Sequence, residues 1–222
     1  MRAMILAAGL GTRMGALTDI TPKPLLRVGG KPLLQFHLEA LAHSGIREVV
    51  INHSRLGAQI EAMFASGASL GLTIHYSAEG DKPLETAGGI RRALPMLGAG
   101  PFLVVNADVW TDFDFACLSS RDPATAHIVL VPNPDHHPQG DFGLAGAQVI
   151  DSGTSRLTYS GIGVFHPRLF QGLKDGPAPL TPLLREAIRR GQVTGERYSG
   201  RWFDIGTRDR LARINQVLRP QF

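Results

Sequence analysis

Met1-Arg-Ala-Met-Ile-Leu-Ala-Ala-Gly-Leu-Gly-Thr-Arg-Met-Gly15 opens the chain, and the rest of the sequence is interpreted from it. Residues 3–8 form an apolar run that predicts a buried strand, and this run leads directly into a glycine-rich loop. Such a loop presents backbone N–H groups to an anion at close range. Thr12 and Arg13 add a hydroxyl donor and a planar cation, both suited to phosphate oxygens. The opening stretch therefore predicts a phosphate-binding loop.

Two other phosphate-binding loops do not fit this stretch. A dinucleotide-binding G-x-G-x-x-G motif needs glycine at the sixth position counted from Gly9, where Met14 stands. A P-loop needs G-x-x-x-x-G-K-[ST], which the sequence does not contain. A tight turn would explain the G-x-G alone. Thr21-Pro-Lys-Pro24 favours a phosphate site, because Lys23 stands between two prolines with pre-set φ.

Composition is typical of an ordinary globular protein. The 222 residues are 43% hydrophobic and 19% charged, and we expect one domain, residues 1–222. The single Cys117 excludes an internal disulfide and is expected to be a buried thiol in a short helix. No apolar stretch reaches the roughly 20 residues of a membrane span, and no signal peptide is evident. We therefore expect a cytoplasmic protein with no membrane partner.

The net charge of +4 gives little indication of a partner. Residues 151–222 hold 12 of the 23 basic side chains, but these are spread over several predicted elements. No block resembles a basic arm or a nucleic-acid surface with interleaved aromatics. A solvated face is the simplest explanation, and an anionic small substrate explains the remaining excess better than a nucleic acid does.

Hydrophobic periodicity predicts an α/β fold. Up to residue 106 the pattern is β-α-β-α-β-α-β, with strands at 3–8, 48–52, 72–76 and 101–106 and helices at 32–44, 56–67 and 86–97. This order predicts a Rossmann-like mixed, mainly parallel sheet with helices on both faces. Ligands bind beyond the carboxyl ends of such strands. The glycine loop, Glu79 and Asp108 should therefore share one rim.

The second half of the chain is less regular. Strands are expected at 128–131, 142–150 and 157–166, the last two as a hairpin-like excursion. A helix at 182–190 is followed by strands at 193–198 and 202–205. Thr207 is expected to cap a last amphipathic helix that carries Leu211, Ile214 and Leu218.

Two carboxylates are candidates for a metal site. Asp108 follows the strand 101–106, and Asp204 stands in Gly200-Arg-Trp-Phe-Asp-Ile-Gly-Thr207. Mg²⁺ is typically held by one or two carboxylates with phosphate oxygens and water. A cap or a turn would explain either aspartate alone, so the magnesium prediction depends on several motifs occurring together.

Such a set of motifs is present. Leu6-Ala-Ala-Gly-Leu-Gly-Thr-Arg-Met14, Pro22-Lys-Pro24, Asn106-Ala-Asp108 and Trp202-Phe-Asp-Ile-Gly-Thr207 resemble, in order, the signature motifs of sugar-1-phosphate nucleotidyltransferases. Further segments resemble one branch, the uridylyltransferases that act on N-acetylmuramate α-1-phosphate in bacterial cell-wall recycling. These segments are Ile51-Asn-His53, Tyr76-Ser-Ala-Glu-Gly80, Pro83-Leu-Glu-Thr-Ala-Gly-Gly89 and Asn133-Pro-Asp-His-His-Pro-Gln-Gly-Asp-Phe142.

The resemblance implies the nucleotide-diphospho-sugar transferase fold and an in-line reaction. A sugar 1-phosphate oxygen attacks the α-phosphorus of a nucleoside triphosphate, and pyrophosphate leaves. Positioning and charge neutralisation do most of this work, so no protein nucleophile is needed. By resemblance, Ala8, Gly9, Gly11 and Thr12 hold the triphosphate, Arg13 stabilises the pyrophosphate, Lys23 lies at the α-phosphate, and Asp108 and Asp204 hold Mg²⁺.

The resemblance also implies residues for the base and the sugar. The carboxylate of Glu79 only accepts, so it can bind N3–H of uracil or the N1–H and N2–H₂ of guanine. It argues against adenine and cytosine more than it separates UTP from GTP. Gly88, beside Gly89, would let the base or sugar lie close to the backbone, although helix–sheet packing explains it equally well. The sugar candidates are Asn106 and Asp141, followed by Gly140 and Ser160.

The chain departs from the family pattern in one consequential place. Many relatives carry a lysine before the strand at Gly161-Ile162 that holds the sugar phosphate, and Val149-Ile-Asp-Ser-Gly-Thr-Ser-Arg156 has none. Arg156, Arg201 or the metal alone could replace it. His136 and His137, in a proline-rich loop, are expected to be solvated. The chain ends without the extra C-terminal domain that assembles some relatives, so we expect a monomer.

The sequence therefore predicts a Mg²⁺-dependent uridylyltransferase that uses UTP and N-acetylmuramate α-1-phosphate. Mannose- or heptose-1-phosphate guanylyltransferase and glucose-1-phosphate thymidylyltransferase are the alternatives within the class. A non-catalytic nucleotide-sugar sensor is the alternative outside it. The presence of Arg13, Lys23, Asp108 and Asp204 argues against the sensor.

Overall fold

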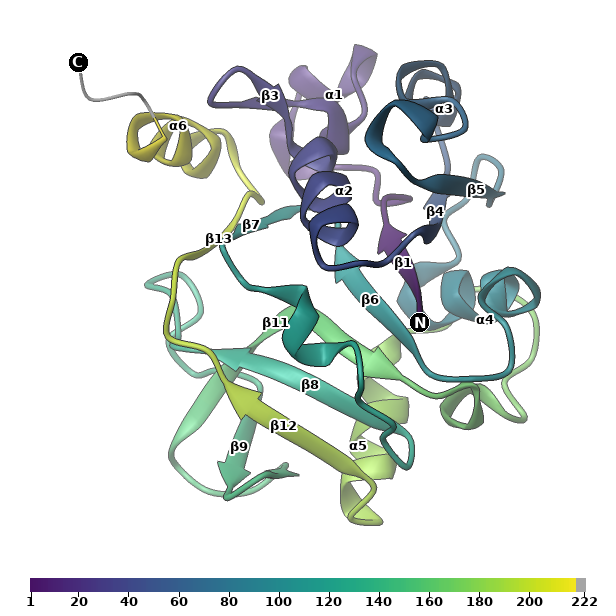
Figure 1. The fold of residues 1–222 in the computed structure, drawn as a ribbon. Coiled ribbons are helices and arrows are strands. Elements are labelled where there is room, and N and C mark those ends of the chain that lie inside the picture. Colours follow the sequence, from purple (N-terminus) through teal and green to yellow (C-terminus); the bar gives the residue numbers. More distant parts are fainter. Residues whose placement is uncertain (219–222) are drawn as a thin grey trace.

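A computed structural model describes residues 1–218, which form a mixed α/β fold around one nine-stranded sheet (Figure 1). The strand order is β5-β4-β1-β6-β11-β8-β12-β10-β9. The strands are β1 (Arg2–Leu6), β4 (Glu48–His53), β5 (Thr73–Ala78), β6 (Phe102–Asn106), β8 (Ala126–Val131), β9 (Phe142–Ala145), β10 (Gln148–Ile150), β11 (Arg156–Phe165) and β12 (Val193–Arg197). Two small ribbons add β2 (Arg27–Val28) with β3 (Lys31–Pro32), and β7 (Val109–Thr111) with β13 (Trp202–Asp204).

The helices are α1 (Leu17–Ile20), α2 (Leu33–His43), α3 (Gly57–Phe64), α4 (Glu85–Leu97), α5 (Leu180–Arg189) and α6 (Arg208–Val217). They cover both faces of the sheet, as predicted. Side chains of β1 alternate between the faces, so Ala3 and Ile5 pack in the core with α2 and α3, while Met4 packs with α4 and α5. Within residues 1–218, no helix is long and apolar enough to cross a membrane.

The first half of the sheet is parallel, as the alternation of strands and helices predicts. β5, β4, β1 and β6 are neighbours with parallel registers. Leu6, the last residue of β1, lies between Asn52 of β4 and Asn106 of β6. Because the carboxyl ends of these strands meet at one edge, the loops that follow them share one rim.

The prediction of a mainly parallel sheet is wrong for the second half. There β11 is antiparallel to β6, β8 and β9, and β10 is antiparallel to β9 and β12, while β12 and β8 are parallel. The pairing of β11 with β9 closes the second-half strands into a barrel-like ring, seen in the lower part of Figure 1. A parallel pair needs a crossover of about a dozen residues or more. The connections between β9, β10 and β11 are too short for one.

The structure also corrects two details of the strands predicted in the second half. Residues 142–150 are a hairpin and not one strand, because Gly146, with a φ of 58°, turns the chain between β9 and β10. Residues 157–166 are no excursion, since β11 lies in the middle of the sheet between β6 and β8.

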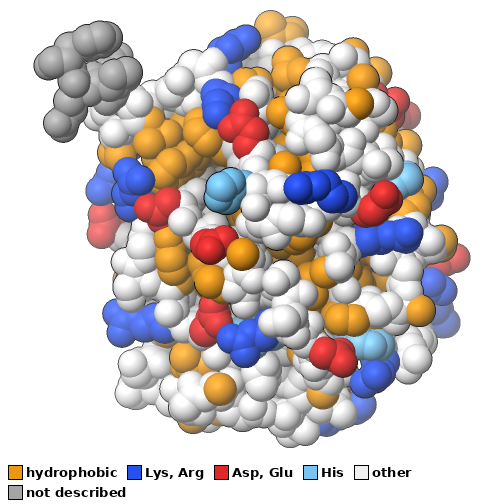
Figure 2. Space-filling model, viewed as in Figure 1, with side chains coloured by type: hydrophobic (Ala, Val, Ile, Leu, Met, Phe, Trp, Pro, Cys, Tyr) orange, Lys and Arg blue, Asp and Glu red, His pale blue; other side chains and the backbone are white. Residues whose placement is uncertain are grey.

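Two local expectations have different outcomes. The Thr207 hydroxyl accepts a hydrogen bond from the backbone N–H of Arg210 and caps α6, as predicted. The expectation that Cys117 is buried is wrong, and the thiol is exposed. Phe115 and Leu118 take the buried positions of this 3₁₀ turn. On the face shown in Figure 2, basic and acidic side chains are interspersed.

His37 links the fold to the rim that carries the candidate site. It is buried in α2, and its Nε2 lies 2.8 Å from the carbonyl oxygen of Val109 in β7. Burial lowers the pKa of His37 from 6.5 to about 4, although this hydrogen bond and the charge of Asp108 oppose the shift. The neutral ring is therefore the form that the fold holds.

We predict a pH-dependent stability that depends on His37. Between pH 6.5 and 4 the unfolded chain binds a proton at this residue and the folded chain does not, so stability falls as the pH is lowered through this window. The slope from one such group is at most about 1.4 kcal/mol per pH unit. His37→Gln, which keeps an N–H donor, should lose part of this slope in urea unfolding measured from pH 4 to 7. An unchanged slope would contradict the prediction. His127 and His166, whose pKa values burial also lowers, keep a residual slope in both proteins.

Candidate active site

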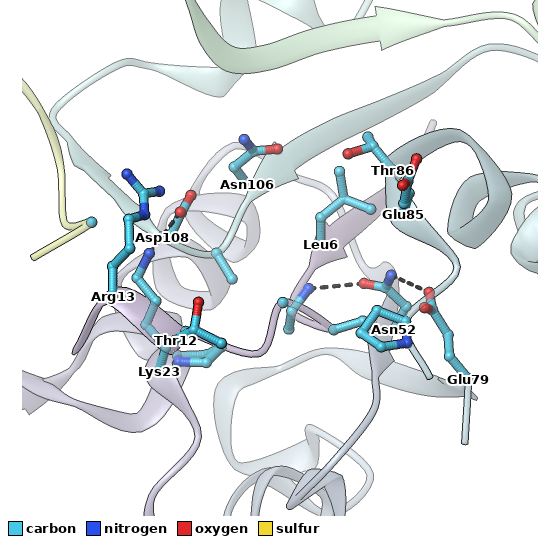
Figure 3. A pocket seen from close by; sticks show the side chains of 18 residues that line it. Leu6, Thr12, Arg13, Lys23, Asn52, Glu79, Glu85, Thr86, Asn106 and Asp108 are labelled. Atoms are coloured by element: carbon cyan, nitrogen blue, oxygen red, sulfur yellow. Dashed lines mark hydrogen bonds and ion pairs between the residues drawn. The ribbon is translucent and has the colours of Figure 1, made fainter. Parts of the chain in front are cut away.

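A cavity of about 300 Å³ lies on the rim formed by the carboxyl ends of β1, β4, β5 and β6 (Figure 3). Most of the residues that the sequence assigns to nucleotide, sugar and metal line it together. They are Ala8, Gly9, Gly11, Thr12, Arg13, Lys23, Glu79, Asn106 and Asp108. Thr12, Arg13, Lys23 and Asp108 lie at one end of the cavity in Figure 3, and Asn52 and Glu79 lie at the other.

The glycines of the loop serve different purposes. Gly11 has a φ of 65°, and a Cβ there would come within 2.9 Å of the Thr18 side chain and 3.3 Å of the Lys23 Cβ. The chain itself therefore requires glycine at this position. A Cβ on Gly9 would meet no atom of the chain within 4 Å. Since Gly9 lines the cavity, the room in front of its backbone is room for a ligand.

Lys23 and Asp108 form an ion pair at the phosphate end. The Lys23 Nζ lies 2.7 Å from Asp108 Oδ2, and the lysine side chain is 9% exposed while the carboxylate is 39% exposed. Lys23 begins a 3₁₀ turn in which Pro24 is the next residue, so its backbone direction is set locally. The pair couples the loop after β1 to the loop after β6. It places a cation and an acid side by side in the cavity wall.

The opposite end of the cavity is organised by a buried amide. Asn52 Nδ2 donates to Glu79 Oε1 at 2.6 Å, and Asn52 Oδ1 accepts from the Ala7 N–H at 2.8 Å. The Leu84 N–H donates to Glu79 Oε2 at 2.6 Å. Each carboxylate oxygen keeps acceptor capacity for a ligand N–H. Glu79 is therefore a rigidly held acceptor, fixed to the strand that precedes the glycine loop.

A second cavity of about 550 Å³ continues from the first and shares Glu85, Thr86 and Asn106 with it. Asp141 and Tyr159 line this cavity, and Asp141 Oδ2 accepts from the Tyr159 N–H at 2.8 Å. Burial raises the pKa of the Tyr159 hydroxyl, which keeps it a neutral donor and acceptor. Asn106 and Asp141, both sugar candidates, thus face connected space.

Three predicted nucleotide- or sugar-binding residues line neither cavity, and neither does the candidate metal ligand Asp204. Gly88 packs against Gly176 and Ala178. A Cβ on Gly88 would overlap the Gly176 carbonyl oxygen, so close packing explains why this residue is a glycine. Gly140 shapes a turn with a φ of 62°, and a Cβ there would lie 2.7 Å from Asn133 Oδ1. Ser160 is 1% exposed, and its hydroxyl donates to the Val129 carbonyl oxygen at 2.7 Å. Gly88, Gly140 and Ser160 thus each make a structural contact, and their binding roles stay predictions.

Gly89, next to Gly88, is the glycine that matters for the first cavity. A Cβ on Gly89 would overlap Glu79 Oε1 and lie 2.8 Å from Asn52 Nδ2. Because Gly89 has no side chain, the Glu79 carboxylate and the Asn52 amide can pack directly against α4.

The two candidate metal ligands are neighbours through the backbone. The Ile205 N–H donates to the Asp108 carbonyl oxygen at 2.7 Å, because β13 pairs with β7. Asp204 contacts two basic groups, an Arg210 nitrogen and His136 Nε2, the latter at 3.1 Å. Among residues 1–218 no cluster of three or more histidine, cysteine, aspartate or glutamate side chains is present. Two carboxylates at a phosphate site suit Mg²⁺, which takes phosphate oxygens and water as its other ligands.

The histidines of the 132–141 loop are paired with carboxylates. His137 Nε2 lies 3.0 Å from Asp141 Oδ1, and His136 meets Asp204. The loop is thereby tied to both the sugar end and the metal end of the site. Both side chains are solvent-exposed, as expected, at 43% for His136 and 40% for His137, and each is also paired with a carboxylate.

The candidate replacements for the missing lysine are engaged elsewhere. Arg156 donates to the Asp151 and Asp141 backbone oxygens, at 2.7 and 3.1 Å. Arg201 pairs with Asp112 at 2.8 Å and lies over the Trp110 ring. Neither arginine lines either cavity.

Arg210 is a cation that the sequence did not single out. A Cβ on Gly206 would overlap an Arg210 nitrogen and lie 3.3 Å from an Arg13 nitrogen, so two guanidinium groups converge at Gly206 on the cavity wall. In the sequence, Arg210 is one of many arginines of the last third. The one local signal in the sequence is that Arg210 lies three residues after Thr207, the expected helix cap, whose hydroxyl accepts from the Arg210 N–H.

The cavity brings basic, acidic and glycine residues together on one rim of an α/β fold, and comparison with known proteins gives the family. The family described as Nucleotidyl transferase matches residues 2–220. The chain belongs to this family.

Individual relatives cover nearly the whole chain. An N-acetylmuramate alpha-1-phosphate uridylyltransferase of Neisseria meningitidis serogroup B is 49% identical over 220 residues, which are 95% of each protein. One of Caulobacter vibrioides is 33% identical over 92% of this chain and 91% of its own length. A putative glucose-1-phosphate thymidylyltransferase of Bacillus anthracis has a similar fold, with a TM-score of 0.85, 23% identity and coverage of 100% of this chain and 97% of its own.

We predict that Asn52→Ala weakens nucleotide binding by releasing Glu79. The variant loses the hydrogen bonds to Glu79 and to the Ala7 N–H, and each such bond contributes about 1 kcal/mol. The KM for the nucleoside triphosphate should rise roughly tenfold, since about 1.4 kcal/mol corresponds to a factor of ten.

Ser54→Ala is the matched control for this variant. The Ser54 hydroxyl also anchors the glycine loop, donating to the Ala8 carbonyl oxygen at 2.6 Å, but it does not contact Glu79. Its KM for nucleotide should change less than that of Asn52→Ala. Equal effects of the two substitutions would show that loop anchoring, and not the position of Glu79, is what the amide provides.

Proposed function

We propose that this protein is a uridylyltransferase that joins UMP from UTP to N-acetylmuramate α-1-phosphate, giving the UDP-sugar and pyrophosphate. Its place would be the recycling of cell-wall sugars. The observation that carries the proposal is the single cavity that holds Glu79 at one end and Arg13, Lys23 and Asp108 at the other. The relatives from Neisseria meningitidis and Caulobacter vibrioides, which cover 95% and 92% of this chain, support the choice of sugar.

The proposed reaction needs no protein nucleophile. A phosphate oxygen of the sugar 1-phosphate forms a new bond to the α-phosphorus of UTP, while the bond from the α-phosphorus to the bridging oxygen of pyrophosphate breaks. The backbone of Gly9, Gly11 and Thr12 would hold the triphosphate, and Arg13 would neutralise charge on the leaving pyrophosphate. Lys23 would donate to the α-phosphate, where charge is redistributed in the transition state.

Asp108 and Asp204 would hold Mg²⁺, which supplies charge neutralisation between the phosphates of the two substrates. Lys23 and Arg210, which contact these carboxylates, lie where each could instead contact a phosphate oxygen. Arg210 therefore joins the metal as a candidate for the role of the missing lysine.

Glu79 would select the base. Uracil offers one N–H to the fixed carboxylate, whereas cytosine and adenine offer an acceptor at the corresponding ring nitrogen. Guanine would also satisfy a carboxylate, so a mannose- or heptose-1-phosphate guanylyltransferase remains the second candidate on this observation. We further propose that the chain acts as one domain and as a monomer.

The first test is a substrate panel. Pyrophosphate release should be fastest with UTP and N-acetylmuramate α-1-phosphate when UTP, GTP and dTTP are each combined with several sugar 1-phosphates. Faster turnover of mannose 1-phosphate with GTP would replace the proposed reaction with the second candidate.

The second test concerns the metal ligands. Asp108→Asn should lower kcat by about 10²- to 10³-fold, as removal of one electrostatic contact to the transition state does elsewhere. Asp112→Asn is the control, because Asp112 lies nearby in the chain but pairs with Arg201 away from the cavity. It should retain Mg²⁺-dependent turnover, with reduced stability at most. Near-normal turnover by Asp108→Asn, or Mg²⁺-independent turnover by the parent protein treated with EDTA, would refute the assignment.

A further inference from the structure

The second cavity contains a basic side chain that the proposed chemistry does not use. Within residues 1–218, Arg185 of α5 is the one basic residue that lines this cavity, and the acidic Glu85 and Asp141 line it too. Much of the remaining wall is apolar, including Phe142, Leu180 and Leu184. Because the cavity opens into the first one at Asn106, an acceptor sugar whose phosphate lies near Asp108 would extend into it.

Arg185 is held in place by an acid behind it. Its Nε lies 3.3 Å from Asp151 Oδ2, and the same carboxylate lies 3.4 Å from a terminal nitrogen of Arg156. Arg156 in turn donates to the Asp141 backbone oxygen. No other ion pair or hydrogen bond of Arg185 occurs within residues 1–218. The two terminal nitrogens are therefore available, and a planar guanidinium edge matches a carboxylate in a two-pronged geometry.

The other arginines of α5 show that this orientation is not a general property of the helix. Arg189 and Arg190 both pair with Glu186, and their side chains are 70% and 62% exposed. Arg185 instead lines the cavity and pairs with the loop after β10. Of these three arginines, Arg185, whose side chain is 49% exposed, is the one that lines the cavity.

We infer that Arg185 binds a carboxylate carried by the sugar of the acceptor, so that the second cavity selects acidic sugar 1-phosphates. The inference rests on the proposed function and names the contact by which the site would recognise its sugar. N-acetylmuramate differs from N-acetylglucosamine by a lactyl ether, which adds one carboxylate and one methyl group. Glu85 and Asp141 disfavour a second anion in this space, Arg185 offsets them, and the apolar wall accepts the methyl group.

The test compares two acceptors in two variants. Arg185→Gln keeps most of the side-chain stem and removes the charge, and Arg189→Gln is the matched control on the same helix. With UTP, Arg185→Gln should lower kcat/KM for N-acetylmuramate α-1-phosphate by about 10- to 100-fold, mainly through KM. For N-acetylglucosamine α-1-phosphate it should change kcat/KM less than about threefold, and Arg189→Gln should leave both unchanged. If N-acetylglucosamine α-1-phosphate turns over too slowly, its inhibition constant against the first acceptor replaces kcat/KM.

The outcomes separate this inference from the proposed function. An equal loss with both acceptors would assign Arg185 to folding or to a general sugar contact, and no loss with the acidic acceptor would remove it from the site. Either result overturns the inference while the uridylyltransferase activity stands. If the parent protein does not use N-acetylmuramate α-1-phosphate at all, the proposed function fails, and this inference fails with it.

Discussion

The parallel register of three strands is the constraint on which the site depends. Leu6 ends β1 between Asn52 of β4 and Asn106 of β6, so the loops after these strands begin side by side. Hydrogen bonds secure the edge, since the Ala7 N–H donates to Asn52 and the Ala107 N–H donates to the Leu6 carbonyl oxygen. A shift of register by one residue would turn these side chains to the other face of the sheet. The glycine loop, Asn52 and Asn106 therefore keep their spacing because the backbone of the sheet fixes it.

The second half of the chain completes the site from the opposite direction. β11 returns antiparallel beside β6, and Gly161, with a φ of 78°, leaves room for the Asn106 side chain, which a Cβ would approach within 2.6 Å. The β13–β7 ribbon then brings Asp204 next to the backbone of Asp108. Two backbone segments separated by 96 positions in the sequence (204 − 108) thus lie side by side through a main-chain hydrogen bond. The β13–β7 pairing, which the sequence pattern did not predict, is what brings the backbone of Asp204 to that of Asp108.

The features that could be predicted from sequence are those that depend on local pattern. The buried strand before Gly9, the alternation of strands and helices to residue 106, and the cap at Thr207 are each set by a few consecutive residues. The pairing of β11 with β6, β8 and β9 is set by distant residues and has no local signature. The same limit applies to side chains. Gly88 and Gly89 are indistinguishable in the sequence, but packing against Gly176 explains the first and proximity to Glu79 explains the second. Asn52 and Arg185 acquire their roles only from partners far along the chain.

Both candidate metal ligands are held in ion pairs. In the structure each candidate metal ligand is balanced by a cation, Asp108 by Lys23 and Asp204 by Arg210. Removing Asp108 would leave the Lys23 ammonium, whose side chain is 9% exposed, without its partner, which is costly. Incoming phosphates would offer Lys23 and Arg210 new anions, and the carboxylates would then be free to hold Mg²⁺ without an uncompensated charge. Such exchangeable pairs would let Lys23 and Arg210 turn to incoming phosphates while Asp108 and Asp204 take a divalent cation. In this proposal the two arginines near Gly206, Arg13 and Arg210, act together with the neighbouring carboxylate of Asp204.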